Sequence, residues 1–438
     1  MNLRALAHEM LEENRDEIVR VVQELVRMPS QNTPPVGQEK ACQEYIAAYL
    51  ERAGLPVSLY EPDQVPGLVE HPAFWPGRDY RDRPNVSSRL VGRGGGRSLL
   101  LTGHVDTVAL GENVWTYPPF GAGIHDGKLY GLGSIDMKGP LGAMLVLYKA
   151  IAQKGIRLKG ALSYESVVDE EEGGVNATIA GRLREGAVDG ALIPEGTDLQ
   201  IYPAARGALI CDFIFRSTKG AWLDAGRSAA PAADAVQQMG LFLAHLDELS
   251  ALRRQHPVHP LYASYPDPTP VQVTKVYAGG WGNRVHIAAP PEGRIELIVQ
   301  TLPGEEREDV YREMMGWLEG VMARYPDAFI VKPEIRFRLR WMAPTAIEPS
   351  HPLALAMADA ARQVMGRAPA ILGAPYACDM FALHQIFNIP GILFGPAGSN
   401  AHAADECVDL ESLFLFWEAL LLFVLEWCGV EDLSGRRT

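Results

Sequence analysis

Cysteine is scarce in this chain of 438 residues, which contains only five. They are Cys42, Cys211, Cys378, Cys407 and Cys428. Their number is odd and none belongs to a Cys-x-x-Cys pair, which argues against both a disulfide framework and a thiolate zinc site. We therefore expect free thiols and a cytoplasmic protein.

Long basic runs and long apolar runs are also missing. No run of Lys and Arg exceeds a pair and the formal net charge is −14, so neither nucleic acid nor an acidic membrane surface is expected as a partner. The most apolar stretch, 413–427, contains Glu418 and is shorter than the about 20 apolar residues that span a bilayer. We expect a buried helix there. The charged N-terminus has no signal-peptide core, so we expect neither export nor membrane insertion.

What is present is an alternation of strand and helix patterns, which predicts an α/β fold with a mixed, mostly parallel sheet and helices on both faces. Residues 62–97 are rich in Pro, Gly and Arg and are interpreted as irregular surface. The predicted elements are strands at 98–102, 161–168 and 187–193, a helix at 141–151, and later a helix at 352–366, a strand at 389–394 and a helix at 411–428.

A second pattern interrupts this alternation and predicts an inserted α+β domain. We expect one domain to comprise 1–207 and 342–438, and the inserted domain to comprise 208–341. Within the insertion the predicted elements are strands at 208–216, 271–277 and 294–301, helices at 232–249 and 305–324, and a loop at 256–270.

Five clusters of residues that could bind metals or act in catalysis lie at or after the predicted strand ends, where ligands bind in open α/β sheets. In the first, His104 and Asp106 follow the strand at 98–102. Residues two apart in an extended segment share a face, so Asp106 can orient the His104 ring as a metal ligand. In the second, Asp136 stands between a glycine-rich turn and a helix, where a carboxylate can bridge two metals or simply cap the helix.

The third cluster is an acidic run, 169–172, which is costly unless solvated or bound to cations. If the run is functional, one of its carboxylates binds a metal and another acts as a general base. Glu195 and His402 form the fourth and fifth clusters. Together the five supply nitrogen and oxygen ligands for two divalent metals, for which zinc is best suited and cobalt or manganese possible.

From a Pro-Ser turn at 29–30 to the final helix, these motifs resemble the co-catalytic metallohydrolase family of acetylornithine deacetylase, succinyl-diaminopimelate desuccinylase, aminoacylase and glutamate carboxypeptidase. The resemblance implies amide hydrolysis, with Glu170 as general base and Asp106 supporting His104. It implies that one metal is held by His104, Asp136 and Glu195, and the other by Asp136, Glu171 and His402. It also implies a non-proline cis peptide after Asp136 and a homodimer built through the inserted lid domain.

The sequence departs from the family pattern at two positions. Asp224 stands where the family has a lid histidine that stabilises the oxyanion, and losing such a donor costs about 100- to 1000-fold in turnover. Gln300 stands where many relatives have an Arg for a substrate carboxylate. Arg206 and Asn283 match family positions and are candidate substrate contacts, as are Asp224 and Gln300.

Three functional hypotheses follow. The first is a deacylase or amidohydrolase of a small N-acylated compound that lacks the usual α-carboxylate contact or has a basic group facing Asp224. The second is an exopeptidase, dipeptidase or ammonia-releasing aminohydrolase on the same metal site. The third is a weakened or non-catalytic binding homologue. The presence of the complete set of metal ligands argues against this third hypothesis.

Overall fold

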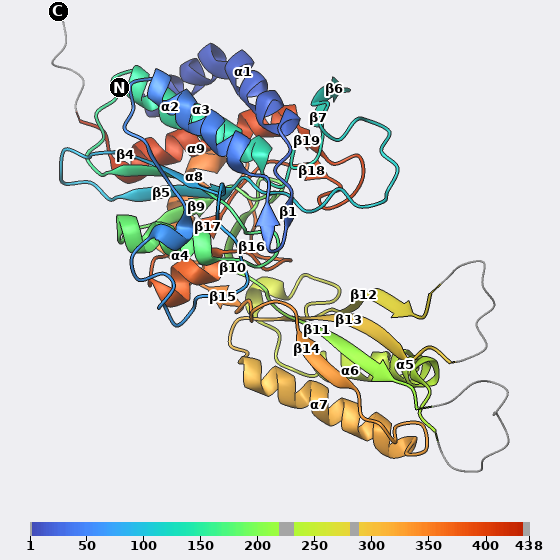
Figure 1. Ribbon diagram of the computed structural model, residues 1–438. Helices are drawn as coiled ribbons and strands as arrows, with labels where there is room; N and C mark the ends of the chain where they lie inside the picture. Colours follow the sequence, from blue (N-terminus) through green and yellow to red (C-terminus); the bar gives the residue numbers. More distant parts are fainter. Residues whose placement is uncertain (1, 219–231, 281–288, 432–438) are drawn as a thin grey trace, which may run out of the picture. The chain divides into compact units, whose positions relative to one another are not determined.

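The computed structural model describes residues 2–218, 232–280 and 289–431. The chain divides into two compact units (Figure 1). The main unit comprises 1–204, 346–374 and 378–438, and the inserted unit comprises 205–345 and 375–377. The division into one domain of 1–207 with 342–438 and an inserted domain of 208–341 remains a prediction.

The centre of the main unit is a run of four parallel strands. β5 (Leu99–His104) pairs in parallel with β8 (Leu162–Val167) and with β9 (Ala191–Ile193), and β9 pairs in parallel with β17 (Gly391–Leu393). Every residue of these strands is buried. Strands covered on both faces are expected to be largely apolar, and the apolar residues at the start of β5 and along β9 fit that pattern, whereas β8 also buries Ser163, Glu165 and Ser166.

The flanking strands are antiparallel. β4 (Asn85–Leu90) pairs with β8 on one side and with β3 (Ser58–Tyr60) on the other. At the opposite side β10 (Ile201–Ala205) pairs with β17, and the short strands β15 (Thr345–Ala346) and β16 (Ile371–Ala374) join β10.

The prediction that 62–97 is irregular throughout is wrong, because it contains β4. Two serines occupy the middle of that strand, at positions 87 and 88, so it carries a weak apolar signal. Its place in the sheet comes from pairing with β8, a contact distant in sequence.

Helices cover both faces of this sheet. On one side, α1 (Leu3–Arg27), α3 (Lys138–Gln153) and α9 (Leu410–Cys428) pack together, and α8 (Pro352–Met365) packs on α9. The helices α1, α2 (Lys40–Arg52) and α3 lie above the strands in Figure 1 and α4 (Asn176–Glu185) lies below them.

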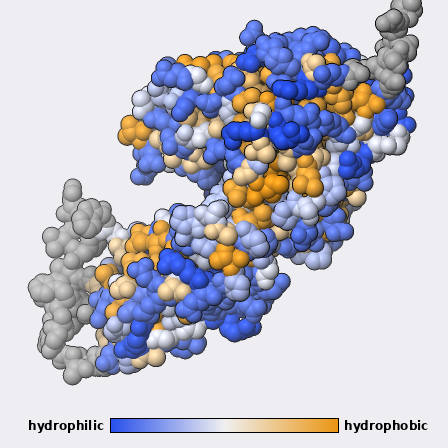
Figure 2. All heavy atoms as spheres, turned by 180° about the vertical axis from the view of Figure 1, so that it is seen from behind, coloured by the Kyte–Doolittle hydropathy of each residue, from blue (hydrophilic) through white to orange (hydrophobic). Residues whose placement is uncertain are grey.

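The prediction of a buried apolar helix near residues 413–427 is confirmed, because nearly every residue of α9 from Phe416 onward is buried. In the described ranges, no helix is both long and apolar enough to cross a membrane. Hydrophilic residues cover much of the face that Figure 2 shows of each unit.

A small antiparallel sheet brings two distant loops together. β7 (Lys128–Tyr130) pairs with β6 (Gly123–His125) and with β19 (Cys407–Asp409), and β19 pairs with β18 (Gly398–Ser399). The loop after β7 carries Asp136, and the loop between β18 and β19 carries His402. The remaining short elements of the main unit are β1 (Asn32–Thr33), β2 (Val36–Gly37), a 3-10 turn at Pro62–Gln64 and a π-helical turn at Ala382–Ile386.

The inserted unit is a four-stranded antiparallel sheet with helices packed against it. The strand order is β12 (Val271–Ala278), β13 (Glu292–Thr301), β11 (Gly207–Arg216), β14 (Glu334–Phe337). Its core forms where Phe213 of β11, Phe242 of α5 (Ala235–Ala244) and Trp317 of α7 (Arg307–Arg324) meet. The helix expected at 232–249 is two helices, α5 (Ala235–Ala244) and α6 (Leu246–Arg253), followed by a 3-10 turn at Pro260–Tyr262 and by α7 (Arg307–Arg324).

Candidate metal centre

Asp136 lies between two histidines that come from opposite ends of the sequence. Its Oδ1 is 3.1 Å from Nε2 of His104, at the end of β5, and its Oδ2 is 3.1 Å from Nε2 of His402. The peptide from Asp136 to Met137 is cis, as the family resemblance implied. His402 has a positive φ of 61°, a conformation that non-glycine residues hold at a cost and often at functional sites.

Further carboxylates flank each histidine. Glu171 Oε2 lies 2.8 Å from His402 Nε2. On the other side Glu195 Oε1 lies 3.6 Å, and Glu170 Oε2 3.9 Å, from His104 Nε2. The structure therefore brings all five predicted ligands and the predicted base together at one edge of the main sheet.

The histidines lie in strongly negative surroundings. Burial disfavours the charged form of His104, yet its carboxylate neighbours outweigh burial and raise its pKa well above the ordinary value. Burial also disfavours the charged form of His402, but Glu171 and Asp136 outweigh burial and raise the pKa of His402 to about 12. The surrounding carboxylates therefore favour positive charge at both histidines.

The pKa values of the carboxyl groups are shifted as well. Burial raises the pKa of Glu170 well above its ordinary value and that of Glu195 to about 8, and neighbouring acids add to both shifts. One of these acids is Asp379, a buried residue that accepts a hydrogen bond from Thr178 and that the sequence analysis did not single out. Asp136 behaves oppositely: burial would raise its pKa, but hydrogen bonds with both histidines hold it well below the ordinary range.

This donor set fits divalent cations. One ligand atom each from His104, Asp136 and Glu171 lies within 4.8 Å of the others, a grouping that could hold a metal ion. With Glu170 and Glu195 the site has four carboxyl groups, which carry a total charge of about −4 when all of them are ionised, and two divalent cations would balance that charge. Imidazole nitrogen and carboxylate oxygen are ordinary zinc ligands.

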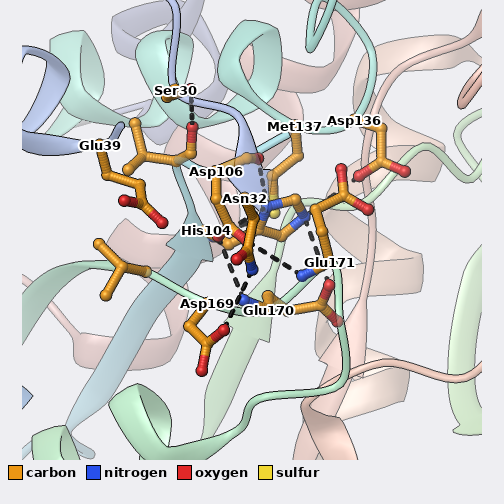
Figure 3. A network of polar contacts seen from close by, with 12 residues as sticks. Ser30, Asn32, Glu39, His104, Asp106, Asp136, Met137, Asp169, Glu170 and Glu171 are labelled. Atoms are coloured by element: carbon orange, nitrogen blue, oxygen red, sulfur yellow. Dashed lines mark hydrogen bonds and ion pairs between the residues drawn. The ribbon is translucent and has the colours of Figure 1, made fainter. Parts of the chain in front are cut away.

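Asp106 supports the site through atoms that differ from the prediction. His104 Nδ1 lies 3.0 Å from the backbone oxygen of Asp106, but 3.6 Å from its carboxylate Oδ1. The fully buried carboxylate instead accepts the backbone N–H groups of Glu170, at 3.2 Å, and Glu171, at 3.1 Å. Asp106 thus joins the His104 segment to the acidic loop (Figure 3).

A buried polar network behind the acidic loop was missed from the sequence. Asn32 Nδ2 donates to Asp106 Oδ2 at 3.0 Å and to Asp169 Oδ1 at 3.1 Å, and Figure 3 shows its amide beside His104. Arg83 donates to Asn32 Oδ1 and to the buried Glu39. The side-chain amide of Asn32 therefore forms hydrogen bonds with three charged residues, Asp106, Asp169 and Arg83.

Asp169 is held from a second direction by residues of the segment expected to be irregular surface. Arg78 Nε donates to it at 3.0 Å and the Tyr80 hydroxyl at 2.7 Å, while Arg78 also donates to the backbone oxygen of Glu172. Arg78, Tyr80 and Arg83 lie within a polar, proline-rich stretch, so hydrophobic periodicity gave no sign of their burial.

Two of the four predicted substrate contacts are described, and both belong to the inserted unit. Arg206 donates to Gln300 Oε1 at 2.6 Å and to the backbone oxygens of Pro375 and Asp267. Its guanidinium also lies near the rings of Tyr262 and Tyr265. The other two, Asp224 and Asn283, lie outside the described residues.

Comparison with known proteins agrees with this geometry. The family model described as Peptidase family M20/M25/M40 matches residues 100–426. The chain is 27% identical over 442 residues to N-formyl-4-amino-5-aminomethyl-2-methylpyrimidine deformylase of Bacillus subtilis, covering 96% of each chain. It is 34% identical over 166 residues to succinyl-diaminopimelate desuccinylase of Methylobacterium radiotolerans, covering 37% of each chain. Among solved structures, human carnosine dipeptidase 1 matches with a TM-score of 0.78 and 16% identity, covering 98% of this chain and 99% of that chain.

The chain belongs to the peptidase family M20/M25/M40, because the family model covers most of its length. The resemblance inferred from the five motifs is thereby confirmed, as is the α/β class with an inserted α+β domain. The chain is a hydrolase that acts on amide bonds.

Proposed function

We propose that the protein is a metal-dependent deacylase that cleaves the amide bond of a small N-acylated amine. The observation that carries the proposal is Asp136, whose two carboxylate oxygens each face one histidine at 3.1 Å. A carboxylate in that position can join two metal ions, which is the arrangement of two-metal hydrolases.

The distances support the ligand sets that the family resemblance implies. One ion would be held by His104, Asp136 and Glu195, and the other by Asp136, Glu171 and His402. The bound ions would lower the pKa of a water molecule and stabilise negative charge on the amide oxygen. Zinc is the first candidate for both positions, and cobalt or manganese are alternatives.

Glu170 is the proposed general base. Its side chain is 15% exposed and its Oε2 lies 3.9 Å from His104 Nε2, so it borders the ligand set and can still reach a substrate. Burial raises its pKa from that of an ordinary glutamate, towards the value suited to proton transfer near neutral pH. Glu170 would take a proton from the attacking water and deliver it to the departing amine nitrogen.

The proposed substrate has no carboxylate next to the amide nitrogen. Arg206 is 4% exposed and its hydrogen-bond partners are neutral groups of the inserted unit, Gln300 among them. The deformylase relative acts, by its name, on a formylated aminomethylpyrimidine, an amine without a carboxylate. Both observations favour an acyl-amine over an acyl-amino acid. Asp224 and Asn283 remain candidate contacts.

A homodimer through the inserted unit is a further part of the proposal. β12 is an edge strand of the four-stranded sheet, and its residues Val276 and Tyr277 are 55% and 58% exposed. An exposed edge with apolar side chains is suited to pairing with another chain. Light scattering of Val276→Glu/Tyr277→Asp beside the wild type tests this: we expect a dimer that becomes a monomer, and a monomeric wild type would contradict it.

Substrate profiling of the metal-loaded enzyme tests the proposed reaction. We expect kcat/KM to be highest for short N-acyl derivatives of aminomethyl heteroaromatics, with release of the carboxylic acid and the free amine. Release of a free amino acid from dipeptides, or of ammonia, as the fastest reaction would favour an exopeptidase or an aminohydrolase. Absence of any amide hydrolysis in the metal-loaded wild type, with restoration by Asp224→His, would point to a weakened homologue.

A further inference from the structure

The two loops that supply Asp136 and His402 are joined by residues just beyond His402. β19 pairs with β7, placing Cys407 opposite Tyr130. One residue earlier, the backbone oxygen of Glu406 accepts the N–H of Gly131 at 2.9 Å. The strand ladder therefore continues as far as Glu406 and stops where the loop carrying Asp136 begins.

The side chain of Glu406 continues this connection into that loop. Oε2 accepts the backbone N–H of Gly133 at 2.8 Å, and Oε1 accepts those of Ile135 at 2.9 Å and Asp136 at 3.1 Å. Glu406 is 1% exposed. One buried carboxylate thus satisfies three backbone donors, including that of the residue between the two histidines.

This position requires a carboxylate. All three partners are donors, and an ionised carboxylate is a pure acceptor with two oxygens. Glutamine would turn an NH₂ group towards at least one backbone N–H, and alanine would leave three donors without their partner.

We propose that Glu406 is a positioning residue, which fixes the backbone at Asp136 so that its two carboxylate oxygens face His104 and His402. The inference rests on the proposed two-metal function. Because Glu406 and His402 belong to the same loop, the carboxylate also sets the distance between the bridging ligand and that histidine. Weakening this connection should disturb both metal positions, since Asp136 contributes to each.

The test compares Glu406→Gln with the matched variant Glu418→Gln. Glu418 is a buried glutamate of α9 in the same unit, 8% exposed, with His8 at 3.4 Å. Zn²⁺ affinity is measured by competition with a chromophoric chelator, and hydrogen exchange of the peptide 131–137 is measured without metal. For Glu406→Gln we expect both zinc affinities to fall about 10- to 100-fold, the effect usual for groups that orient metal ligands, together with faster exchange of 131–137. Glu418→Gln should match the wild type in both.

A residue needed only for folding would give a different result. Glu406→Gln would then lower Tm, while the folded fraction would bind both ions with wild-type affinity and keep its exchange rate at 131–137, and that outcome would overturn the inference. If Glu406→Gln does not fold, Glu406→Asp takes its place. It keeps the charge but withdraws the oxygens by about 1.5 Å, so the same losses are expected, and their absence would overturn the inference. A wild type that binds no zinc would overturn the proposed function as well.

Discussion

Asn32 offers the sharpest test of how the acidic loop is held. Its Nδ2 donates to Asp106 and to Asp169, two carboxylates that are both fully buried. Hydrogen bonds to charged groups contribute about 1.5 to 3 kcal/mol each. Loss of these two hydrogen bonds alone, apart from the one that Arg83 donates to Asn32 Oδ1, should lower the free energy of unfolding of the main unit in Asn32→Ala by about 3 to 6 kcal/mol.

Asn85 provides a matched control. It is also fully buried, but its two hydrogen bonds join only neutral backbone groups, the oxygen of Ala177 and the N–H of Val168. Neutral hydrogen bonds contribute about 0.5 to 1.5 kcal/mol each, so Asn85→Ala should cost about half as much as Asn32→Ala. Asn32→Asp should lower the free energy of unfolding more than Asn32→Ala does, because it adds a third carboxylate beside two that already repel each other.

The assay is hydrogen exchange of peptides from β5 and β8 along a urea series, which reports unfolding of the main unit. The expected order of stability is wild type, Asn85→Ala, Asn32→Ala, Asn32→Asp. Equal losses for the two alanine variants, or an Asn32→Asp variant as stable as Asn32→Ala, would refute the view that Asn32 stabilises the buried carboxylates by donating hydrogen bonds to them.

Three other predictions concern the site itself. Glu170→Gln should lower kcat about 100- to 10,000-fold, as expected for loss of a general base, while zinc stoichiometry measured by elemental analysis stays that of the wild type. Because Glu171 and Asp136 raise the pKa of His402 to about 12, and burial raises that of Glu195 to about 8, both hold protons at pH 7 that a metal must displace. Zinc binding should therefore release protons and tighten as pH rises from 6 to 8, which calorimetry in buffers of different ionisation enthalpy measures; pH-independent binding would contradict this. Asp106→Asn should weaken both zinc affinities about 10- to 100-fold, because it disturbs the backbone of Glu170 and Glu171.

Much of the site could be predicted because its ligands follow buried strands. The apolar run ending at His104 and the acids after β8 share an edge of the sheet, and strand periodicity reveals that edge. Asp106 was predicted as a supporting residue, but its carboxylate binds backbone N–H groups of the acidic loop. Side-chain spacing alone cannot distinguish these two partners.

The supporting network could not be predicted from local pattern. Arg78 and Arg83 lie in a polar segment whose burial arises from contacts with Asp169 and Glu39, which are distant in sequence. β4 was missed for the same reason. Long-range pairing determines these positions, and hydrophobic periodicity carries no information about it.

Metal stoichiometry tests the central claim most directly. Protein depleted of metal, reconstituted with zinc and freed of excess, should contain two ions per chain by elemental analysis, and Asp136→Ala should hold neither tightly. Wild-type protein without bound metal, or Asp136→Ala retaining both ions at wild-type affinity, would contradict a centre in which Asp136 joins two cations.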